Sequence, residues 1–507
     1  MKLRVIYFFL LLVSSFACEA LQELETIDAV RHEAAYAFPL VNTDLRLEDF
    51  LDAYRQNGTL EMAEDGLLSF SYREEVFSQS GKDLLEEISA GFPKLIPVPE
   101  KITVLPAGLA GGIVFDRLDI AAGKLGYSFA SAQRKPVTVV IRFPNIQSGG
   151  QVLQFSHTLP AWSGTGAFPV HSASPFDLSG YRILTPDGQF AIQYTATDAD
   201  GVEVPLENFI VSFQDLIFSL AQGYLGQLLL QGDSGRLELD FFENRLNGEI
   251  AFASPRISLI ADNGIGLPSR IGFDRFDVIG SDGTVKRLES QLTDGGVEVA
   301  YPLTIGTTAN SSFVIDAENS NLTALLEGSP VAVDYSMNAL INPSGDTNIR
   351  GFVSDTGDYK LAMELSLPFF GSLTDFVARD TLDMDFSAFS DFDRADFKLV
   401  TDNALPLALT LQGYFVDDSY RVLAALLDNP LPVVMAAPVD PGGVTTGRSS
   451  QTTLIPFDPE KFSAIQSATR LILVATFSSA NDGQAVKIFD HQDLAIRMGV
   501  ILSKFNQ

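Results

Sequence analysis

The chain of 507 residues has one cysteine, one tryptophan and four histidines. A single cysteine excludes an internal disulfide and any structural zinc site built on several thiolates. Basic residues are also scarce, because 34 Lys and Arg stand against 64 Asp and Glu and give a net charge of −30. So acidic a chain has little to offset phosphate repulsion, and we exclude nucleic acid as a partner.

Long hydrophobic runs are missing as well. Residues 209–230 are largely apolar, but Asp215 and three glutamines interrupt them, and a central aspartate is costly in a bilayer. We therefore predict buried strands there. Hydrophobic residues make up 46% of the chain, as in globular proteins, and the length predicts two to four domains at roughly 150 residues each.

The N-terminus has the three parts of a secretory signal. Residues 1–4 carry Lys2 and Arg4, residues 5–13 are apolar, and residues 14–17 end in Ala17. The apolar run is shorter than the roughly 20 residues that a membrane-spanning helix needs. Cys18, the only cysteine, follows directly at the expected cleavage point.

This arrangement resembles a bacterial lipoprotein signal, although Ser15 stands where an aliphatic residue is usual. The resemblance implies that Cys18 is lipidated and becomes the first residue of the mature chain. Glu19 in place of Asp implies the outer membrane, and the acidic residues 19–25 resemble the tethers of surface-exported lipoproteins. Loss of two basic residues leaves 34 − 2 = 32 against 64 acidic ones, a mature charge of −32. The alternative is ordinary cleavage after Ala17 or Ala20, with Cys18 incidental.

The remaining pattern predicts a mainly β protein. Residues 47–54 and 82–90 have helical spacing, whereas from about Lys101 the apolar residues alternate with period two. Asp-Gly and Asn-Gly pairs such as Asp187-Gly188 and Asp282-Gly283 punctuate the strands and favour hairpin turns. Near the C-terminus, Asp458 followed by Pro459 predicts a helix start. The expected fold is a set of tandem antiparallel β-sandwich modules with a small mixed α/β N-terminal region and a short C-terminal helix.

Three segment pairs repeat at nearly constant spacing. Residues 257–268 match 397–406 at an offset of 140, and both contain Asp-Asn followed by Leu-Pro. Residues 190–194 match 331–335, and residues 237–241 match 382–386. The matches predict duplicated modules over about 165–305 and 306–437, unless strand–turn–strand patterns simply recur. The Asp-Asn and Leu-Pro pattern loosely resembles late-embryogenesis-abundant-like β-sandwich domains.

These boundaries lead to six predicted segments along the chain. They are a signal peptide (1–17), a tether and mixed α/β region (18–98), a first β region (99–305), a second β module (306–437), a linker (438–453), and a C-terminal helix with strands (454–507).

No catalytic constellation stands out, so we predict no catalytic, cofactor or metal residue. The histidines (His32, His157, His171 and His491) are scattered and read as ordinary side chains. Asp198-Ala199-Asp200 with Glu203 resembles part of a calcium loop, but a solvated hairpin turn explains it as well. Trp162 could stack on a sugar or simply pack in the protein.

Residues 38–42, 365–371 and 483–489 resemble exported β-rich lipoproteins of Gram-negative bacteria that carry no assigned activity. The resemblance implies location and architecture only. The sequence therefore predicts a non-enzymatic outer-membrane lipoprotein, anchored at Cys18, that acts as a scaffold for an envelope protein or a glycan. The alternatives are a secreted carbohydrate-active hydrolase that uses paired carboxylates, and an adhesin or calcium-stiffened surface protein.

Overall fold

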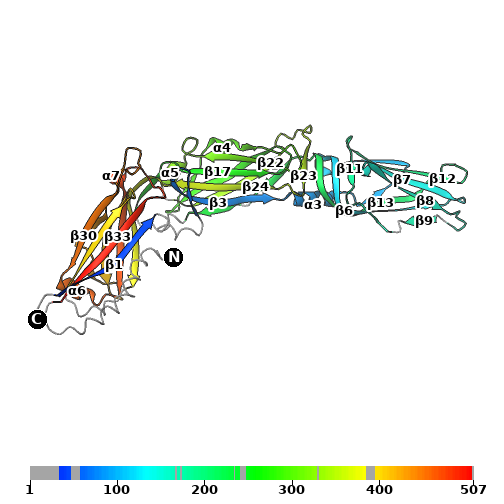
Figure 1. Ribbon diagram of the computed structural model, residues 1–507. Helices are drawn as coiled ribbons and strands as arrows, with labels where there is room; N and C mark the ends of the chain where they lie inside the picture. The colour runs from blue at the N-terminus through cyan, green and yellow to red at the C-terminus, as the bar shows by residue number, and fades with distance from the viewer. Residues whose placement is uncertain are drawn as a thin grey trace.

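Period-two alternation produces antiparallel strands along almost the whole described chain. The computed structural model describes residues 34–46, 58–165, 168–171, 174–232, 234–239, 247–327, 330–383 and 394–504. These residues are mainly β with a few short helices, which confirms the predicted fold class. Within them, no helix has both the length and the apolar character that a membrane crossing requires. The strands build three domains that follow one another in a bent rod, in which the C-terminal domain lies at an angle to the other two (Figure 1).

The distal domain forms one end of the rod. Its strands are hydrogen-bonded in one continuous sheet that folds into two facing layers, because β11 pairs with β6 in one layer and with β7 in the other. Rings from the two layers meet in the core, as where Tyr194 and Phe209 lie 5.6 Å apart. The strands are β4 (Leu95–Pro97), β5 (Ile102–Pro106), β6 (Val114–Ser131), β7 (Val137–Ser148), β8 (Gln151–Leu159), β9 (Phe168–His171), β10 (Phe176–Asp177), β11 (Arg182–Leu184), β12 (Gln189–Asp198), β13 (Glu207–Tyr224) and β23 (Gly351–Ser354), with the short helix η3 (Ala110–Gly112).

The middle domain is a sandwich of two sheets. One has the order β2-β3-β24-β17-β21, and the other β14-β22-β18-β19, with β15 and β20 added to β22 and β18. Its elements are β2 (Thr59–Met62), β3 (Leu68–Gln79), β14 (Leu228–Gln231), β15 (Gly235–Glu238), β17 (Arg256–Asn263), β18 (Ser269–Gly280), β19 (Val285–Arg287), α4 (Gln291–Gly295), β20 (Val297–Val299), β21 (Ala309–Ile315), α5 (Leu322–Leu326), β22 (Pro330–Ile341) and β24 (Tyr359–Pro368).

The C-terminal domain is a second sandwich at the other end of the rod. Its sheets have the orders β1-β33-β26-β30 and β16-β25-β31-β27-β28, with β29 and β32 added to β27 and β25. Its elements are β1 (Ala34–Arg46), β16 (Asn247–Phe252), β25 (Phe370–Asp383), β26 (Arg394–Asn403), β27 (Leu407–Val416), β28 (Val422–Ala425), β29 (Leu431–Val434), β30 (Ser449–Phe457), α6 (Pro459–Ile465), β31 (Arg470–Ser479), α7 (Ala480–Gly483), β32 (Val486–Lys487) and β33 (Asp493–Lys504).

The three domains are nested along the chain. The chain starts in the C-terminal domain with β1, enters the middle domain with β2 and β3, and reaches the distal domain with β4. It passes back through β14 and β15 to β16 of the C-terminal domain, then out again through β17–β22 to β23 of the distal domain. From there it returns by β24 and closes the C-terminal domain when β33 pairs with β1. The expected ranges 99–305 and 306–437 do not coincide with these domains, because strands from both ranges build the middle one. Segment composition carries no information on which distant strand will be a neighbour.

The segment expected as a linker, residues 438–453, lies inside the C-terminal domain. It contains a loop closed by a bridge between Val439 and Thr445 and then the first half of β30, which pairs with β26. Its Pro and Gly residues marked a loop correctly, but the loop joins two strands of one domain.

Two predicted helices are present with their caps. The helix α3 (Gly81–Gly91) starts after Ser80, whose side chain accepts a hydrogen bond from the Lys82 N–H. In α6, the Asp458 carboxylate accepts the Lys461 N–H at 2.8 Å, and Phe462 and Ile465 are buried. The helix expected over residues 47–54 falls outside the described residues.

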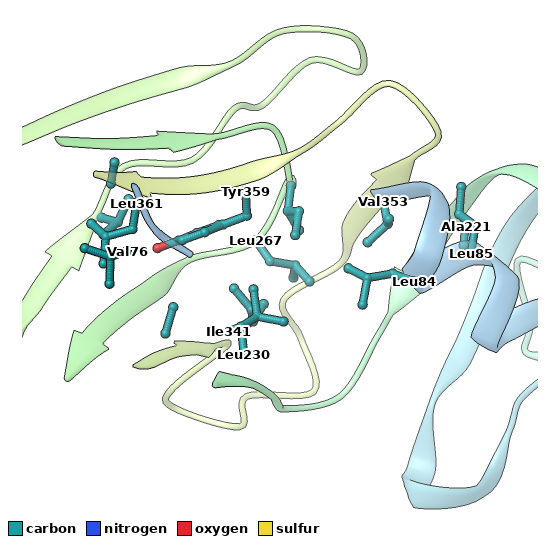
Figure 2. Close-up of a cluster of buried hydrophobic side chains, with 14 of the residues drawn as sticks. Val76, Leu84, Leu85, Ala221, Leu230, Leu267, Ile341, Val353, Tyr359 and Leu361 are labelled. Atoms are coloured by element: carbon teal, nitrogen blue, oxygen red, sulfur yellow. The ribbon is translucent and has the colours of Figure 1, made fainter. Parts of the chain in front are cut away.

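The hydrophobic core continues from the middle domain into the distal one. Figure 2 shows Leu84 and Leu85 of α3 between Val353 of β23 and Ala221 of β13. A side chain on Gly81 would lie 2.2 Å from the Ser354 carbonyl oxygen, so only glycine allows α3 to approach so closely. We infer a stiff joint, since packed interiors resist deformation.

The strongest internal match lies at equivalent places in two domains. β17 and β26 each occupy the same position in their sheets, and each is followed by a crossing to the opposite sheet, into β18 and β27. α5 and α6 likewise precede the paired strands β22 and β31. In contrast, the matching residues 190–194 and 331–335 lie in β12 and β22. These strands have different neighbours in their sheets, so their places are not equivalent.

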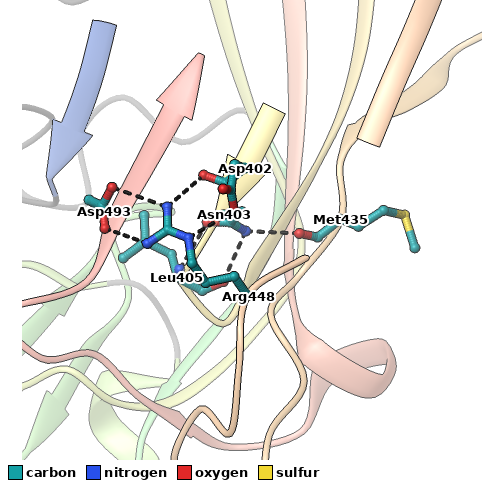
Figure 3. A network of polar contacts seen from close by, with 6 residues as sticks. All are labelled: Asp402, Asn403, Leu405, Met435, Arg448 and Asp493. Atoms are coloured by element: carbon teal, nitrogen blue, oxygen red, sulfur yellow. Dashed lines mark hydrogen bonds and ion pairs between the residues drawn. The ribbon is translucent and has the colours of Figure 1, made fainter. Parts of the chain in front are cut away.

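A buried asparagine ends the strand in both copies. Asn263 and Asn403 are 0% and 1% exposed, and their side-chain oxygens accept the N–H of Ile265 and Leu405, two residues on. The Asn403 Nδ2 lies 2.9 Å from three carbonyl oxygens, including that of Met435 (Figure 3). Where the chain leaves one sheet for the opposite one, backbone groups lose their partners in the sheet, and the asparagine amide supplies hydrogen bonds to them.

Beside Asn403, an ionic network ties three chain segments together. Arg448 donates to the Asp402 carboxylate at 2.8 Å and to the Asp493 carboxylate at 2.7 Å (Figure 3). The hydrogen bond from Arg448 lowers the pKa of Asp493. The network links the loop before β30 to the end of β26 and the start of β33.

We expect Asn403→Ala to destabilise the C-terminal domain by about 2 to 3 kcal/mol, because it leaves buried carbonyls without a donor. Asn310→Ala is the matched control, since the Asn310 side chain is exposed and bonds only to Asp262 among the described contacts; its cost should stay near ~0.5 kcal/mol. Urea unfolding followed by far-UV circular dichroism measures both. Equal shifts would contradict the role assigned to Asn403.

Arg448→Met should reduce stability at pH 7 and lose part of this deficit in acid. Because the folded-state pKa of Asp493 is lowered, its contribution is present above the unfolded pKa of about 3.9 and disappears as pH falls through the folded value. The difference in urea midpoint between wild type and variant should therefore shrink from pH 7 to pH 3. Lys360→Met, which removes an exposed ion pair with Asp358, serves as control. A pH-independent difference for Arg448→Met would contradict this.

Candidate functional site

Several residues singled out in the sequence lie at the free end of the distal domain. We call this end the distal tip and define it as residues 132–136, 160–165 and 199–206, the loops after β6, β8 and β12. Figure 1 places these strand ends at the extremity of the rod that is farthest from the C-terminal domain. The tip contains Trp162, Asp200 and Glu203, and His157 lies on the adjoining strand β8.

Trp162 is held by the loop between β6 and β7. Its backbone N–H donates to the Gln133 carbonyl at 3.1 Å. Arg134 donates to the carbonyls of Trp162 and Gly164 at 3.2 and 3.1 Å. A Cβ on Gly164 would lie 2.5 Å from the indole carbon Cζ2, so the loop folds closely against the ring. The half-buried indole is thus fixed by its own loop and partly open to solvent.

The acidic residues of the tip form a hairpin turn with lysine partners. The Asp198 carboxylate accepts the N–H groups of Asp200 and Val202, both at 2.9 Å. Lys135 bonds to Asp200, which raises the lysine pKa, and Lys101 lies 2.5 Å from Glu203 and lowers the pKa of that carboxyl. The described residues contain no group of three or more His, Cys, Asp or Glu placed to hold a metal ion. The Asp198 bonds form the hairpin turn itself, and the two lysines neutralise its other acidic side chains.

His157 joins an aromatic cluster between the layers. Its Nε2 lies 2.5 Å from the Tyr127 hydroxyl, and burial raises the pKa of Tyr127. The rings of Tyr127 and Phe155 are 5.1 Å apart, and those of Phe129 and His157 are 5.9 Å apart. The histidine supplies a partner for a tyrosine hydroxyl that is otherwise surrounded by apolar rings.

A shallow hollow of about 310 Å³ lies on the other side of the distal domain, between α3 and β13. Two carboxylates, Glu86 and Asp215, line it together with Lys94. Asp215 has a left-handed φ of 50° at an irregular part of the β13–β6 pairing. Ser89, also in the lining, donates to the Leu85 carbonyl and accepts the Phe218 N–H, so its hydroxyl has a structural role.

The other residues singled out in the sequence are not among those that define the tip. Cys18, His32 and the acidic residues 19–25 lie outside the described residues. His171 ends β9 and pairs with Ser128 of β6, close to the tip loop 132–136. His491 is exposed, with its ring nitrogen 3.6 Å from Asp490, at the joint between the middle and C-terminal domains.

Arg134 and Lys135 were missed in the sequence. They are adjacent in the loop after β6, yet one holds the Trp162 loop and the other the Asp198 turn. No local spacing signals this, because the partners follow 28 to 65 residues later.

The chain matches no protein-family model and no curated protein. Among solved structures it is similar to a protein described as a "putative secreted protein" from Parabacteroides distasonis, with 13% identity, 57% of this chain and 90% of that chain covered, and a TM-score of 0.29. It is also similar to a structure of the infectious bursal disease virus Gx strain, with 9% identity, 88% and 82% covered, and a TM-score of 0.16. Both scores are too low to indicate a shared fold, so neither similarity assigns a function.

Gly164→Ala should displace the indole of Trp162 toward water and shift its fluorescence emission to longer wavelength. Trp162 is the only tryptophan, so the signal reports on the distal tip alone. Gly295→Ala is the control, because a Cβ there meets no atom within 4 Å. An unchanged emission spectrum of Gly164→Ala would contradict the close packing of the loop on the ring.

Proposed function

We propose that the protein is an exported lipoprotein, anchored at Cys18 in the outer membrane, and that it acts as a non-enzymatic rod that presents the distal tip to an envelope protein or a glycan. The signal-like residues 1–17 followed by the only cysteine support the anchor. The nested connectivity is the observation that carries the proposal.

The chain enters the rod at the end opposite to the distal tip. Ala34 pairs with Lys504 at the outer end of the C-terminal domain, whereas Arg46 pairs with Asp493 toward the middle domain. Cys18 precedes Ala34 by 34 − 18 = 16 positions, so a lipid on it would hold this end of the rod at the membrane. A lipoprotein anchor with several acyl chains attaches stably, unlike a single chain.

The length of the rod supports a spacer role. β33, β24 and β13 have 12, 10 and 18 residues and belong to successive domains. At about 3.3 Å per residue their summed length is roughly 130 Å along the bent rod. The distal tip would then stand far from the lipid surface, where Trp162 and the Lys135–Asp200 and Lys101–Glu203 pairs are available to a partner.

Cys18→Ser should move the protein from the membrane fraction to the soluble fraction, because no other cysteine can carry the lipid. Trp162→Ala, which changes the opposite end of the rod, should remain in the membrane fraction. Fractionation of cells with detection of the protein, and mass spectrometry of the mature N-terminus, measure both. Membrane retention of Cys18→Ser would overturn the anchor.

A further inference from the structure

The edge strand β5 of the distal domain has an unused hydrogen-bonding side. β5 is the last strand of its layer and pairs with β12 alone. The Tyr194 N–H donates to the Lys101 carbonyl at 2.9 Å, so residues 101, 103 and 105 face β12. The backbone N–H and C=O groups of Ile102 and Val104 therefore point away from the sheet. Within the described part of the chain no strand pairs with them.

The side chains of these two residues are exposed as well. Ile102 is 59% exposed and Val104 48%, on the outer face of the layer. Such an edge is a template for a further strand. Proline limits its length, because Pro106 has no N–H to donate and Pro99 precedes the strand.

The outer face that continues from β5 carries little charge. Paired residues form rows across the four strands β5, β12, β7 and β8. The row that begins at Ile102 continues with Gln193, Arg142 and Gln154, and the next two rows hold only Thr, Val and Ser side chains. These rows are Thr195, Val140 and Ser156, and Thr197, Thr138 and Thr158. Arg142 is the only charged residue in the three rows, in a chain with a net charge of −30. A second acidic chain can approach this face without strong repulsion.

We propose that β5 pairs with β5 of a second copy of this chain, antiparallel and centred on Thr103. The backbone N–H and C=O groups that point away from the sheet belong to Ile102 and Val104, one on each side of Thr103. Ile102 of each copy can therefore exchange two backbone hydrogen bonds with Val104 of the other. Their exposed side chains meet on the outer face. This is the isologous contact that a twofold axis generates.

The charges near the strand agree with this register. Antiparallel pairing about Thr103 sets Lys101 opposite Leu105 and Glu100 opposite Pro106 of the second copy. Like charges therefore do not face each other across the pair, where they would be destabilising. Lys101 also remains available to its own Glu203, 2.5 Å away.

Antiparallel pairing directs the two rods in opposite directions. Their distal domains overlap, and their C-terminal domains lie at opposite ends. Together with the proposed anchor at Cys18, this geometry joins copies on two facing membranes and not copies on the same one; this consequence rests on the proposed function. The contact rests on the backbone bonds between Ile102 and Val104 of the two copies and on a few side chains. Single pairs should therefore be weak, and many anchored copies should act together.

Disulfide trapping tests the pairing in solution. In the mature chain with Cys18→Ser, the added pair Ile102→Cys and Val104→Cys should give a covalent dimer under mild oxidation, since each new thiol faces its counterpart in the second copy. The control pair Thr195→Cys and Thr158→Cys lies on the same face but away from the edge. At least tenfold more dimer from the edge pair is the expected result. Equal amounts from both pairs, or monomer only, would overturn the proposal.

Charge variants test the register without a covalent bond. The double variant Ile102→Lys with Val104→Glu places opposite charges across the antiparallel pair and should still associate in sedimentation experiments. Ile102→Lys with Val104→Lys should associate at least tenfold more weakly. Val104→Pro should also weaken association, and it removes an N–H that β12 does not use. Wild-type-like association of the double lysine variant would overturn the register, and Trp162 emission verifies that each variant is folded.

Vesicles separate this inference from the anchor. Lipidated wild-type protein on two populations of vesicles should cluster them, and Val104→Pro should not. If the Cys18→Ser chain dimerises but the wild-type protein stays soluble and does not bind vesicles, the anchor is refuted and the strand pairing stands. Bound protein that dimerises but does not cluster vesicles would overturn the antiparallel arrangement between facing membranes.

Discussion

The pairing of strands that are far apart in the sequence is the constraint on which the whole rod depends. β1 pairs with β33 and β3 with β24, so the C-terminal and middle domains are each closed by one strand from before the distal strands β4–β13 and one from after them. In the distal domain, β6 pairs with β13 across strands of that same domain. The entropy cost of closing a loop grows only slowly with its length, which makes such large insertions tolerable. The shortest of the three loops is that of the distal domain. When β6 and β13 pair, the chain segments on either side of them come close together, which shortens the loop that the pairing of β3 with β24 must close. The pairing of β3 with β24 does the same for β1 and β33.

The nested arrangement also explains why a chain of several sandwiches behaves as one rod. Successive domains share several chain crossings, and the core passes through the α3 joint without interruption. At the joint with the C-terminal domain, backbone hydrogen bonds connect Leu68 to Ile488 and Asp490 to Gly66. A rod with continuous joints of this kind fits the proposed spacer role.

Local features were predictable where neighbours in sequence decide the outcome. The caps at Ser80 and Asp458 start helices because a side-chain oxygen meets nearby N–H groups. The repeated Asp-Asn and Leu-Pro motif was visible, and in both copies the asparagine satisfies a strand crossing. The distal tip was only partly visible. Trp162 and Asp198 could be noticed, but Arg134 and Lys135, which hold them, have no signature of their own.

The sequence by itself determined the β class, the turns, the two capped helices and the position of the only cysteine next to a signal-like segment. These follow from periodicity, backbone preferences and composition, all of which act over a few residues. Only the tertiary structure decided the nesting of domains, the placement of the loops that carry Trp162, Asp200 and Glu203 at one end, and the open edge of β5. Those depend on which strands become neighbours, and strand pairing relies on backbone groups that are the same in almost every residue.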